Sequence, residues 1–151
     1  MPGTKPAHRA PLWWAAAIAL AGFADAAYLT VDHYITLPLP CTILHGCEKV
    51  LTSPWSMVGP IPLAAFGVAF YLFALFAALY LATAPALSRL LARAFFGLTL
   101  IGLLFSVAFE SIQAFIIRAL CMYCAGSALA TLLLFICGMF VLRRSGHEFA
   151  A

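Results

Sequence analysis

Four long apolar runs constrain the fold of this chain more than any other feature of its sequence. They cover about residues 12–35, 61–83, 94–117 and 121–142. Each run is long enough to cross a hydrocarbon core of about 30 Å as a helix, which rises by about 1.5 Å per residue. The runs must be helical there, because lipid offers no water to satisfy backbone amides. We therefore predict an all-α fold, an integral membrane four-helix bundle, formed by one domain over residues 1–151.

The composition excludes a water-soluble globule. Of the 151 residues, 66% are hydrophobic and only 9% are charged, whereas a soluble domain carries about 25% charged residues. The eight Lys and Arg residues are spread along the chain and form no clustered basic face of the kind that nucleic acid binding needs. We therefore expect the lipid bilayer as the surroundings of the chain, and no nucleic acid partner.

The basic residues are unequally divided between the two ends of the predicted bundle. With four spans, both termini and the loop between the second and third spans share one side. That side collects Lys5, Arg9, Arg89, Arg93, Arg143 and Arg144. The other side has only Lys49 and Arg118. The positive-inside rule predicts a multi-pass protein of the inner (cytoplasmic) membrane with cytoplasmic termini, and a large extracytoplasmic loop over residues 37–60.

Four of the five cysteines fall on the predicted outer side. Cys41 and Cys47 lie in the large loop, and Cys121 and Cys124 form a C-x-x-C motif where the third span turns into the fourth. Disulfides persist in that compartment. If the motif occupies the first turn of the fourth span, the positive end of the helix lowers its thiol pKa, as redox disulfides require. Two such pairs can pass electrons through mixed disulfides, which indicates a thiol–disulfide relay.

Other interpretations of the cysteines stay open from the residues alone. Two cysteine pairs can form a Cys₄ metal cage, which would make the chain a metal-binding membrane protein. The disulfides can also serve only to staple the outer loop. We favour redox chemistry and expect no metal, because the cysteines lie in an oxidising compartment and no other ligand clusters accompany them. The fifth cysteine, Cys137, lies deep in the fourth span and is expected to be a small buried hydrophobe.

An ordered set of motifs runs through nearly the whole chain. It consists of GFADAAYLTVDHY at 22–34, the C-x₅-C of Cys41 and Cys47, Ser53 with Trp55, GPIPLAAFGVAFY at 59–71, and C-M-Y-C at 121–124. In this set and order the chain resembles bacterial members of the vitamin K epoxide reductase (VKOR) family. The resemblance implies a quinone-linked thiol–disulfide oxidoreductase. Such an enzyme oxidises an extracytoplasmic thioredoxin-like partner, reduces a membrane quinone and supports disulfide bond formation.

The resemblance also implies a role for each motif residue. Cys41 would exchange with the thioredoxin-like, DsbA-type partner, and Cys47 would attack the inner pair at Cys121. Cys124 would deliver electrons to the quinone, either ubiquinone or menaquinone. Ser53 matches a family serine that helps to organise the quinone site between loop and bundle. These assignments make the four cysteines the expected catalytic residues.

Departures from other members of the family and from a rival family refine this expectation. Many bacterial members carry a fused thioredoxin-like domain; this chain ends at Ala151 after four spans, so we expect a separate partner. The animal enzymes have a tyrosine where this chain has Ala128, which argues against vitamin K epoxide as the native substrate. The DsbB type of quinone-linked oxidase also has four spans and two cysteine pairs. Its C-x-x-C lies in the first outer loop, which argues against that alternative.

Polar residues inside the spans are candidates for proton and quinone chemistry. Two helical stripes, expected to face the bundle interior, contain Asp25, Tyr28 and Asp32, and Ser106, Glu110 and Gln113. They either hydrogen-bond between helices or handle protons and a quinone carbonyl. The roles of Asp25 and Glu110 stay open. We expect Gln113 to contact the quinone, because its amide donates a hydrogen bond without carrying charge.

Overall fold

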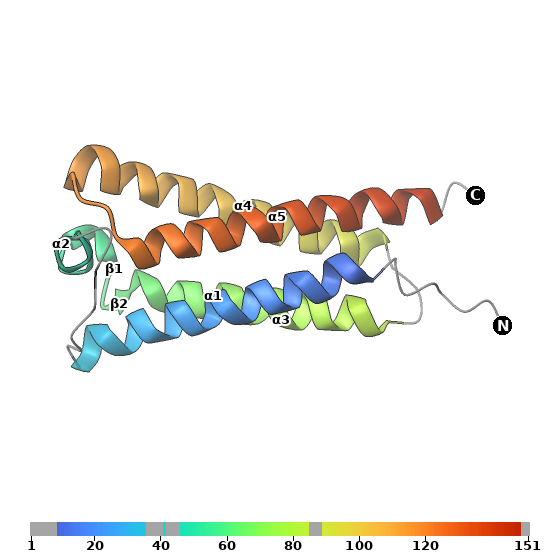
Figure 1. The fold of residues 1–151 in the computed structure, drawn as a ribbon, viewed down its shortest axis with the longest axis horizontal. Coiled ribbons are helices and arrows are strands. Elements are labelled where there is room, and N and C mark those ends of the chain that lie inside the picture. Colours follow the sequence, from blue (N-terminus) through green and yellow to red (C-terminus); the bar gives the residue numbers. More distant parts are fainter. Residues whose placement is uncertain (1–8, 36–40, 42–45, 85–88, 149–151) are drawn as a thin grey trace.

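Four long helices lie alongside one another and form nearly the whole molecule (Figure 1). The computed structural model describes residues 9–35, 41, 46–84 and 89–148. The long helices are α1 (Ala10–Ile35), α3 (Leu63–Thr83), α4 (Arg89–Ile112) and α5 (Met122–Glu148). All four are long and apolar enough to cross a membrane. The prediction of an all-α membrane four-helix bundle is therefore confirmed.

Small residues allow the helices to approach one another closely. α1 packs against α3 and α5, and α4 packs mainly against α5. The fully buried small residues of the α1–α3 side are Ala15, Ala19, Ala74 and Ala78, spaced four apart on each helix as in close-packed membrane helices. Large apolar side chains such as Phe73 and Phe105 point outward and are exposed. Small residues inside and large apolar residues outside suit a bundle whose surface faces lipid.

Two of the helices extend several residues beyond the apolar runs that predict them. α4 begins at Arg89 rather than at about residue 94, and α5 continues to Glu148 rather than ending at about residue 142. The apolar runs mark only the part that lies in hydrocarbon. A helix continues past that part where basic side chains such as the exposed Arg93 and Arg143 can reach the polar interface.

One end of the bundle is closed by short elements, and we call it the cysteine end. The described part of the predicted loop is not a plain loop, because it folds into α2 (Cys47–Leu51), η2 (Pro54–Ser56), β1 (Met57–Val58) and β2 (Ile61–Pro62). The two strands pair antiparallel, with Val58 opposite Ile61. Pro62 directly precedes α3, a position where its missing N–H costs no helical hydrogen bond.

At the opposite end of the bundle, Arg9, which directly precedes α1, binds the end of α3. Arg9 Nη1 donates to Ala82 O at 2.7 Å, and Arg9 Nη2 donates to Ala84 O at 2.8 Å. These carbonyls belong to the last turn of α3, where no helical N–H remains to bind them and a positive charge is favourable. The start of α1 and the end of α5 both lie at this end (Figure 1).

Candidate redox site

A disulfide joins Cys41 to Cys47 at the cysteine end. The Cα atoms of the two residues are 6.4 Å apart. Cys47 is the first residue of α2 and is fully buried, whereas Cys41 is half-buried. The outer pair of the predicted relay therefore has one member that is partly open to the surroundings and one that faces the interior.

Hydroxyl groups fix the end of α2 and the segment that follows it. Ser53 Oγ donates to Val50 O at 2.7 Å, and Ser56 Oγ donates to Leu51 O at the same distance. These carbonyls lie in the last turn of α2, where helical partners are missing. Ser53 thus lies directly behind the short helix that carries Cys47. Its predicted contact with a quinone stays a prediction.

The second pair lies at the start of α5. Cys121 directly precedes this helix, and its carbonyl accepts the N–H of Ala125 at 3.0 Å. Cys121 is fully buried and belongs to one buried cluster with Cys47, Val50 and Ile117. Cys124 lies in the first turn of α5, is half-buried and packs against the same cluster. Both Cys121 and Cys124 are free thiols.

The surroundings of Cys121 favour its thiolate. A hydrogen bond from the Cys124 thiol is the largest contribution, and the backbone N–H groups of Tyr123 and Cys124 add to it. Together they outweigh desolvation by burial and lower the pKa of Cys121 to about 7 from its ordinary value of 9.0. A thiol at a helix start is stabilised as thiolate in this way, and a thiol of lowered pKa leaves more readily in thiol–disulfide exchange.

Gln113 holds the turn that carries Cys121. Its side chain is fully buried, and its Oε1 accepts the N–H of Cys121 at 2.9 Å. Its Nε2 donates to Glu110 Oε1 at 3.4 Å. Its backbone carbonyl accepts the N–H of Ala119 at 3.2 Å. Both the oxygen and the nitrogen of this amide thus have partners within the protein. The predicted contact of Gln113 with a quinone carbonyl stays a prediction.

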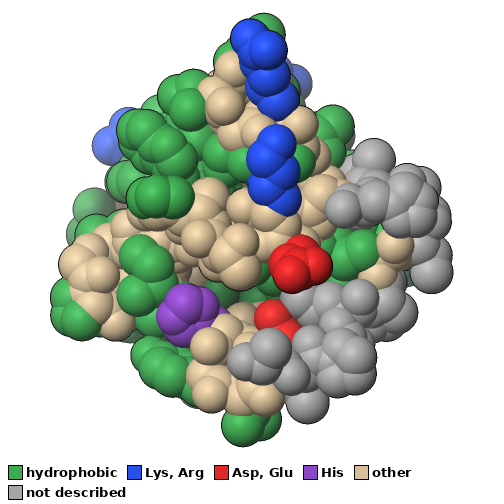
Figure 2. Space-filling model, turned by 90° about the vertical axis from the view of Figure 1, so that its left-hand side faces the viewer, with side chains coloured by type: hydrophobic (Ala, Val, Ile, Leu, Met, Phe, Trp, Pro, Cys, Tyr) green, Lys and Arg blue, Asp and Glu red, His purple; other side chains and the backbone are tan. Residues whose placement is uncertain are grey.

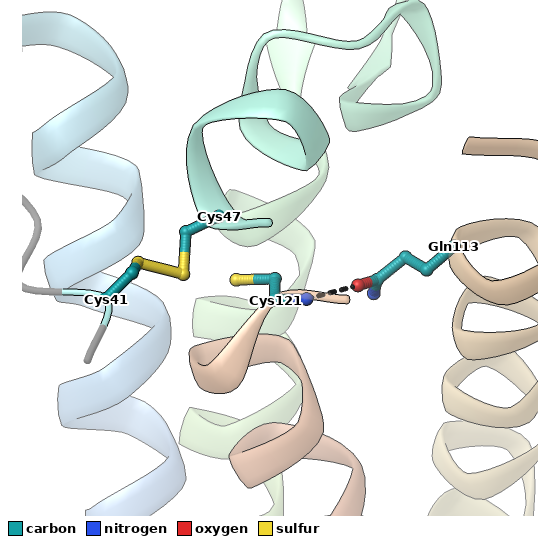
Figure 3. Close-up of a disulfide and its surroundings, with 4 residues drawn as sticks. All are labelled: Cys41, Cys47, Gln113 and Cys121. Carbon is teal, nitrogen blue, oxygen red and sulfur yellow. Dashed lines mark hydrogen bonds between the residues drawn. A yellow bond between two sulfur atoms is a disulfide. The ribbon is translucent and has the colours of Figure 1, made fainter. Parts of the chain in front are cut away.

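Figure 3 shows how Cys121 is oriented between these groups. Its sulfur points toward the Cys41–Cys47 disulfide, and its N–H points away from the disulfide to Gln113. The main chain of Cys121 is therefore anchored on one side, while the sulfur is presented on the other. Cys47 and Cys121, which come from distant parts of the sequence, are brought together as the sequence predicts for a relay.

Apolar and aromatic side chains pack against the same buried cluster as Cys124. Phe109 and Ile112 of α4 pack against the same cluster as Cys124, and the rings of Tyr28 and Tyr123 lie 5.7 Å apart. Within the described ranges, Asp25 Oδ2 and Asp32 Oδ1 are buried and have no hydrogen-bond partner. The first polar stripe of the sequence thus places carboxylates in the interior.

The remaining candidates lie apart from this cluster. Cys137, expected to be a small buried hydrophobe, is only half-buried and packs against the main core of the bundle. Among the residues that the structure describes, no group of three or more His, Cys, Asp or Glu side chains is placed to hold a metal ion. Gly46, by contrast, directly precedes Cys47 and lies beside the cluster against Leu120, a contact that no pattern in the sequence indicates.

The surface of the cysteine end carries charges of both signs among apolar side chains (Figure 2). Its exposed charged residues on α2 are Glu48 and Lys49, and Arg118 is exposed in the α4–α5 turn. Charged side chains of this kind are expected in the polar region outside the hydrocarbon core rather than within it.

Comparison with known proteins gives a family for the chain. No curated protein matches it. The family model described as "Vitamin K epoxide reductase family" matches residues 13–139, which include both cysteine pairs. This range covers most of the chain. The chain therefore belongs to the vitamin K epoxide reductase family, whose members are membrane thiol–disulfide oxidoreductases linked to a quinone.

Proposed function

We propose that this protein oxidises an extracytoplasmic thioredoxin-like partner of DsbA type and passes the electrons to a membrane quinone, thereby supporting disulfide bond formation. One observation carries the proposal. Cys47, one half of a disulfide, shares a buried cluster with Cys121, whose sulfur points toward that disulfide. Cys124 follows one turn later, among apolar side chains. The four sulfurs thus form a path from a half-buried cysteine to the interior of the bundle.

The first step of this path exchanges a disulfide with the partner. A thiolate of the reduced partner attacks the sulfur of Cys41, and Cys47 leaves as a thiolate. The second thiol of the partner then closes the partner's own disulfide and releases Cys41. The partner has lost two electrons and two protons, and the Cys41–Cys47 pair has gained them.

The second step moves the electrons inward. The Cys47 thiolate attacks the sulfur of Cys121 in a Cys121–Cys124 disulfide, and Cys124 leaves as a thiolate. Cys41 then attacks Cys47, which re-forms the outer disulfide and leaves the inner pair reduced. An outer disulfide beside two inner thiols is the state that the structure describes. Closure of the Cys121–Cys124 disulfide gives two electrons and two protons to the quinone.

The surroundings of Cys124 fit a quinone as acceptor, either ubiquinone or menaquinone. Phe109 and Ile112 add apolar surface to the cluster against which Cys124 packs. Tyr123 packs against the same cluster, and its ring and that of Tyr28 suit the flat face of a quinone ring. A quinone bound there would supply a two-electron acceptor. The protein would supply the thiols and would exclude water from them.

The distribution of charge supports the orientation of the bundle. Arg9 lies at the end opposite the cysteine end, where it binds α3. Arg89, Arg93 and Arg143 belong to the parts of α4 and α5 at that same end. By the positive-inside rule, this distribution supports a cysteine end that faces outside the cytoplasm, in the compartment where disulfides persist. The inner membrane is the proposed location.

The function is tested by removing the last cysteine of the path. We expect Cys124→Ala in the purified protein to abolish quinone reduction by a reduced thioredoxin-like partner, because the inner disulfide can no longer close. The absorbance change of the quinone gives the rate. Cys137→Ala is the matched control and should keep the wild-type rate, since Cys137 packs in a different cluster. A Cys124→Ala protein that reduces quinone at near the wild-type rate would contradict the relay.

A further inference from the structure

Gly46 lies against the main chain of the α4–α5 turn. A Cβ atom on Gly46 would lie 2.6 Å from Leu120 O, 2.7 Å from Leu120 N and 2.9 Å from Ala119 Cβ. Such separations are shorter than Cβ contacts in real proteins. The atoms in the way belong mainly to the backbone, which cannot swing aside like the end of a flexible side chain. Only glycine allows this approach.

The contact joins the two residues that precede the reacting cysteines. Gly46 directly precedes Cys47, and Leu120 directly precedes Cys121. The Gly46 carbonyl also accepts the N–H of Val50 at 3.0 Å and so starts α2. The start of α2 is therefore pressed against the residue before Cys121. The backbone N–H of Cys121 is also hydrogen-bonded to Gln113 (Figure 3). This bond opposes a movement of Cys121 away from α2.

The glycine is required by this contact and not by its own backbone conformation. Gly46 has φ −93° and ψ 1°, which other residues adopt without a left-handed strain. An alanine at this position would thus be tolerated in an open loop. Here its methyl group would have to push α2 away from Leu120, and Cys47 would move with α2.

We propose that Gly46 is a positioning residue that sets the distance between the sulfurs of Cys47 and Cys121. This inference rests on the proposed relay, in which the Cys47 thiolate attacks Cys121. Thiol–disulfide exchange needs a direct approach of the attacking sulfur. A misplacement of reacting groups by about 1 Å can slow a reaction by about a hundredfold. The methyl group of an alanine would cause a shift of that kind at the step between the two pairs.

The test isolates the two sulfurs that must meet. In a Cys41→Ser, Cys124→Ser, Cys137→Ser background, only Cys47 and Cys121 remain to form a disulfide under mild oxidation. Mass spectrometry and the gel shift of alkylated protein follow its formation. We expect rapid formation in this background and formation at least about tenfold slower when Gly46→Ala is added. Gly97→Ala is the matched control, because a Cβ at Gly97 meets no atom within 4 Å.

The outcomes separate the positioning role from the relay itself. A background that forms no Cys47–Cys121 disulfide would overturn the proposed relay. Equal rates with and without Gly46→Ala would overturn the role of Gly46 alone and leave the relay in place.

A second measurement on the otherwise wild-type chain distinguishes positioning from general damage to the loop. We expect Gly46→Ala to keep the single-turnover oxidation of the partner by the Cys41–Cys47 disulfide, while steady-state quinone reduction falls about tenfold or more. An equal fall in both rates would overturn the proposal, because the substitution would then act on the whole loop.

Discussion

Cys121 is the residue whose surroundings are most closely defined. Its sulfur accepts hydrogen bonds from the Cys124 thiol and from the first turn of α5, and its N–H is bound by Gln113. The sequence predicts part of this arrangement, because a C-x-x-C motif at the start of a helix places its first thiol near backbone N–H groups. It does not predict the bond to Gln113, since that contact depends on the shape of the turn between them.

The lowered pKa of Cys121 predicts how its thiolate depends on pH. Reduced Cys121 is mainly a thiol below about pH 7 and mainly a thiolate above it. In Cys124→Ala the largest contribution to the shift is lost, so the pKa should rise toward its ordinary value and the thiolate should appear only at higher pH. Thiolate absorbance against pH measures this in a Cys137→Ala background, with Cys121→Ala as the blank. An unchanged midpoint in Cys124→Ala would show that the Cys124 thiol does not stabilise the thiolate.

Between α4 and α5, the chain turns through elements that no sequence pattern indicates. The last turn of the third span is a π-helical turn, η3 (Gln113–Ile117), and Arg118 follows it in the left-handed conformation with φ 54°. The apolar run predicts that a helix crosses the membrane but not how it ends. A left-handed arginine is unfavourable by itself, so the surrounding contacts select it. Gln113 supplies several of these contacts.

The turn should therefore depend on the side chain of Gln113. Gln113→Leu keeps the approximate volume but leaves the buried N–H of Cys121 without an acceptor, which costs about 1–3 kcal/mol. We expect a lower free energy of unfolding in detergent, measured by denaturant titration. Ser111→Ala is the matched control, because Ser111 is exposed and its hydroxyl only donates to Val107 O within the same helix. Equal stability of the two variants would show that the bond to Cys121 contributes nothing.

At the scale of the whole molecule, the sequence predicts the number of helices better than their arrangement. Length and apolarity are local properties, so four spans, with both cysteine pairs at one end of the bundle, could be inferred from the runs. The side of the membrane that this end faces stays a prediction from the charges. The packing of α1 against both α3 and α5 could not be inferred from the runs. It depends on close approaches between residues far apart in the chain. Gly46 and Leu120 make one such approach, and Gly22 and Tyr71 make another.

Three helices are connected at one level of the bundle by Gly22 on α1, Tyr71 on α3 and Ser127 on α5. The ring of Tyr71 on α3 fills the space where a Gly22 side chain on α1 would lie. The Tyr71 hydroxyl is 2.8 Å from both the carbonyl O and the Oγ of Ser127 on α5, and it donates to the carbonyl. A methyl group on Gly22 would displace the ring and with it the hydroxyl. The added methyl group on α1 would thus also disturb the hydrogen bonds between Tyr71 on α3 and Ser127 on α5.

We therefore expect Gly22→Ala to destabilise the bundle although alanine favours helices. Overpacking of this kind costs about 1–3 kcal/mol, whereas the gain in helix propensity is about 1 kcal/mol. Thermal unfolding in detergent should show a lower midpoint for Gly22→Ala and an equal or higher midpoint for Gly97→Ala, where the added methyl group meets no neighbour. Tyr71→Phe separates the two contributions, because it keeps the ring but removes the hydrogen bonds to Ser127. If Gly22→Ala raised the midpoint as much as Gly97→Ala, the close approach of α1 to Tyr71 would contribute nothing to stability.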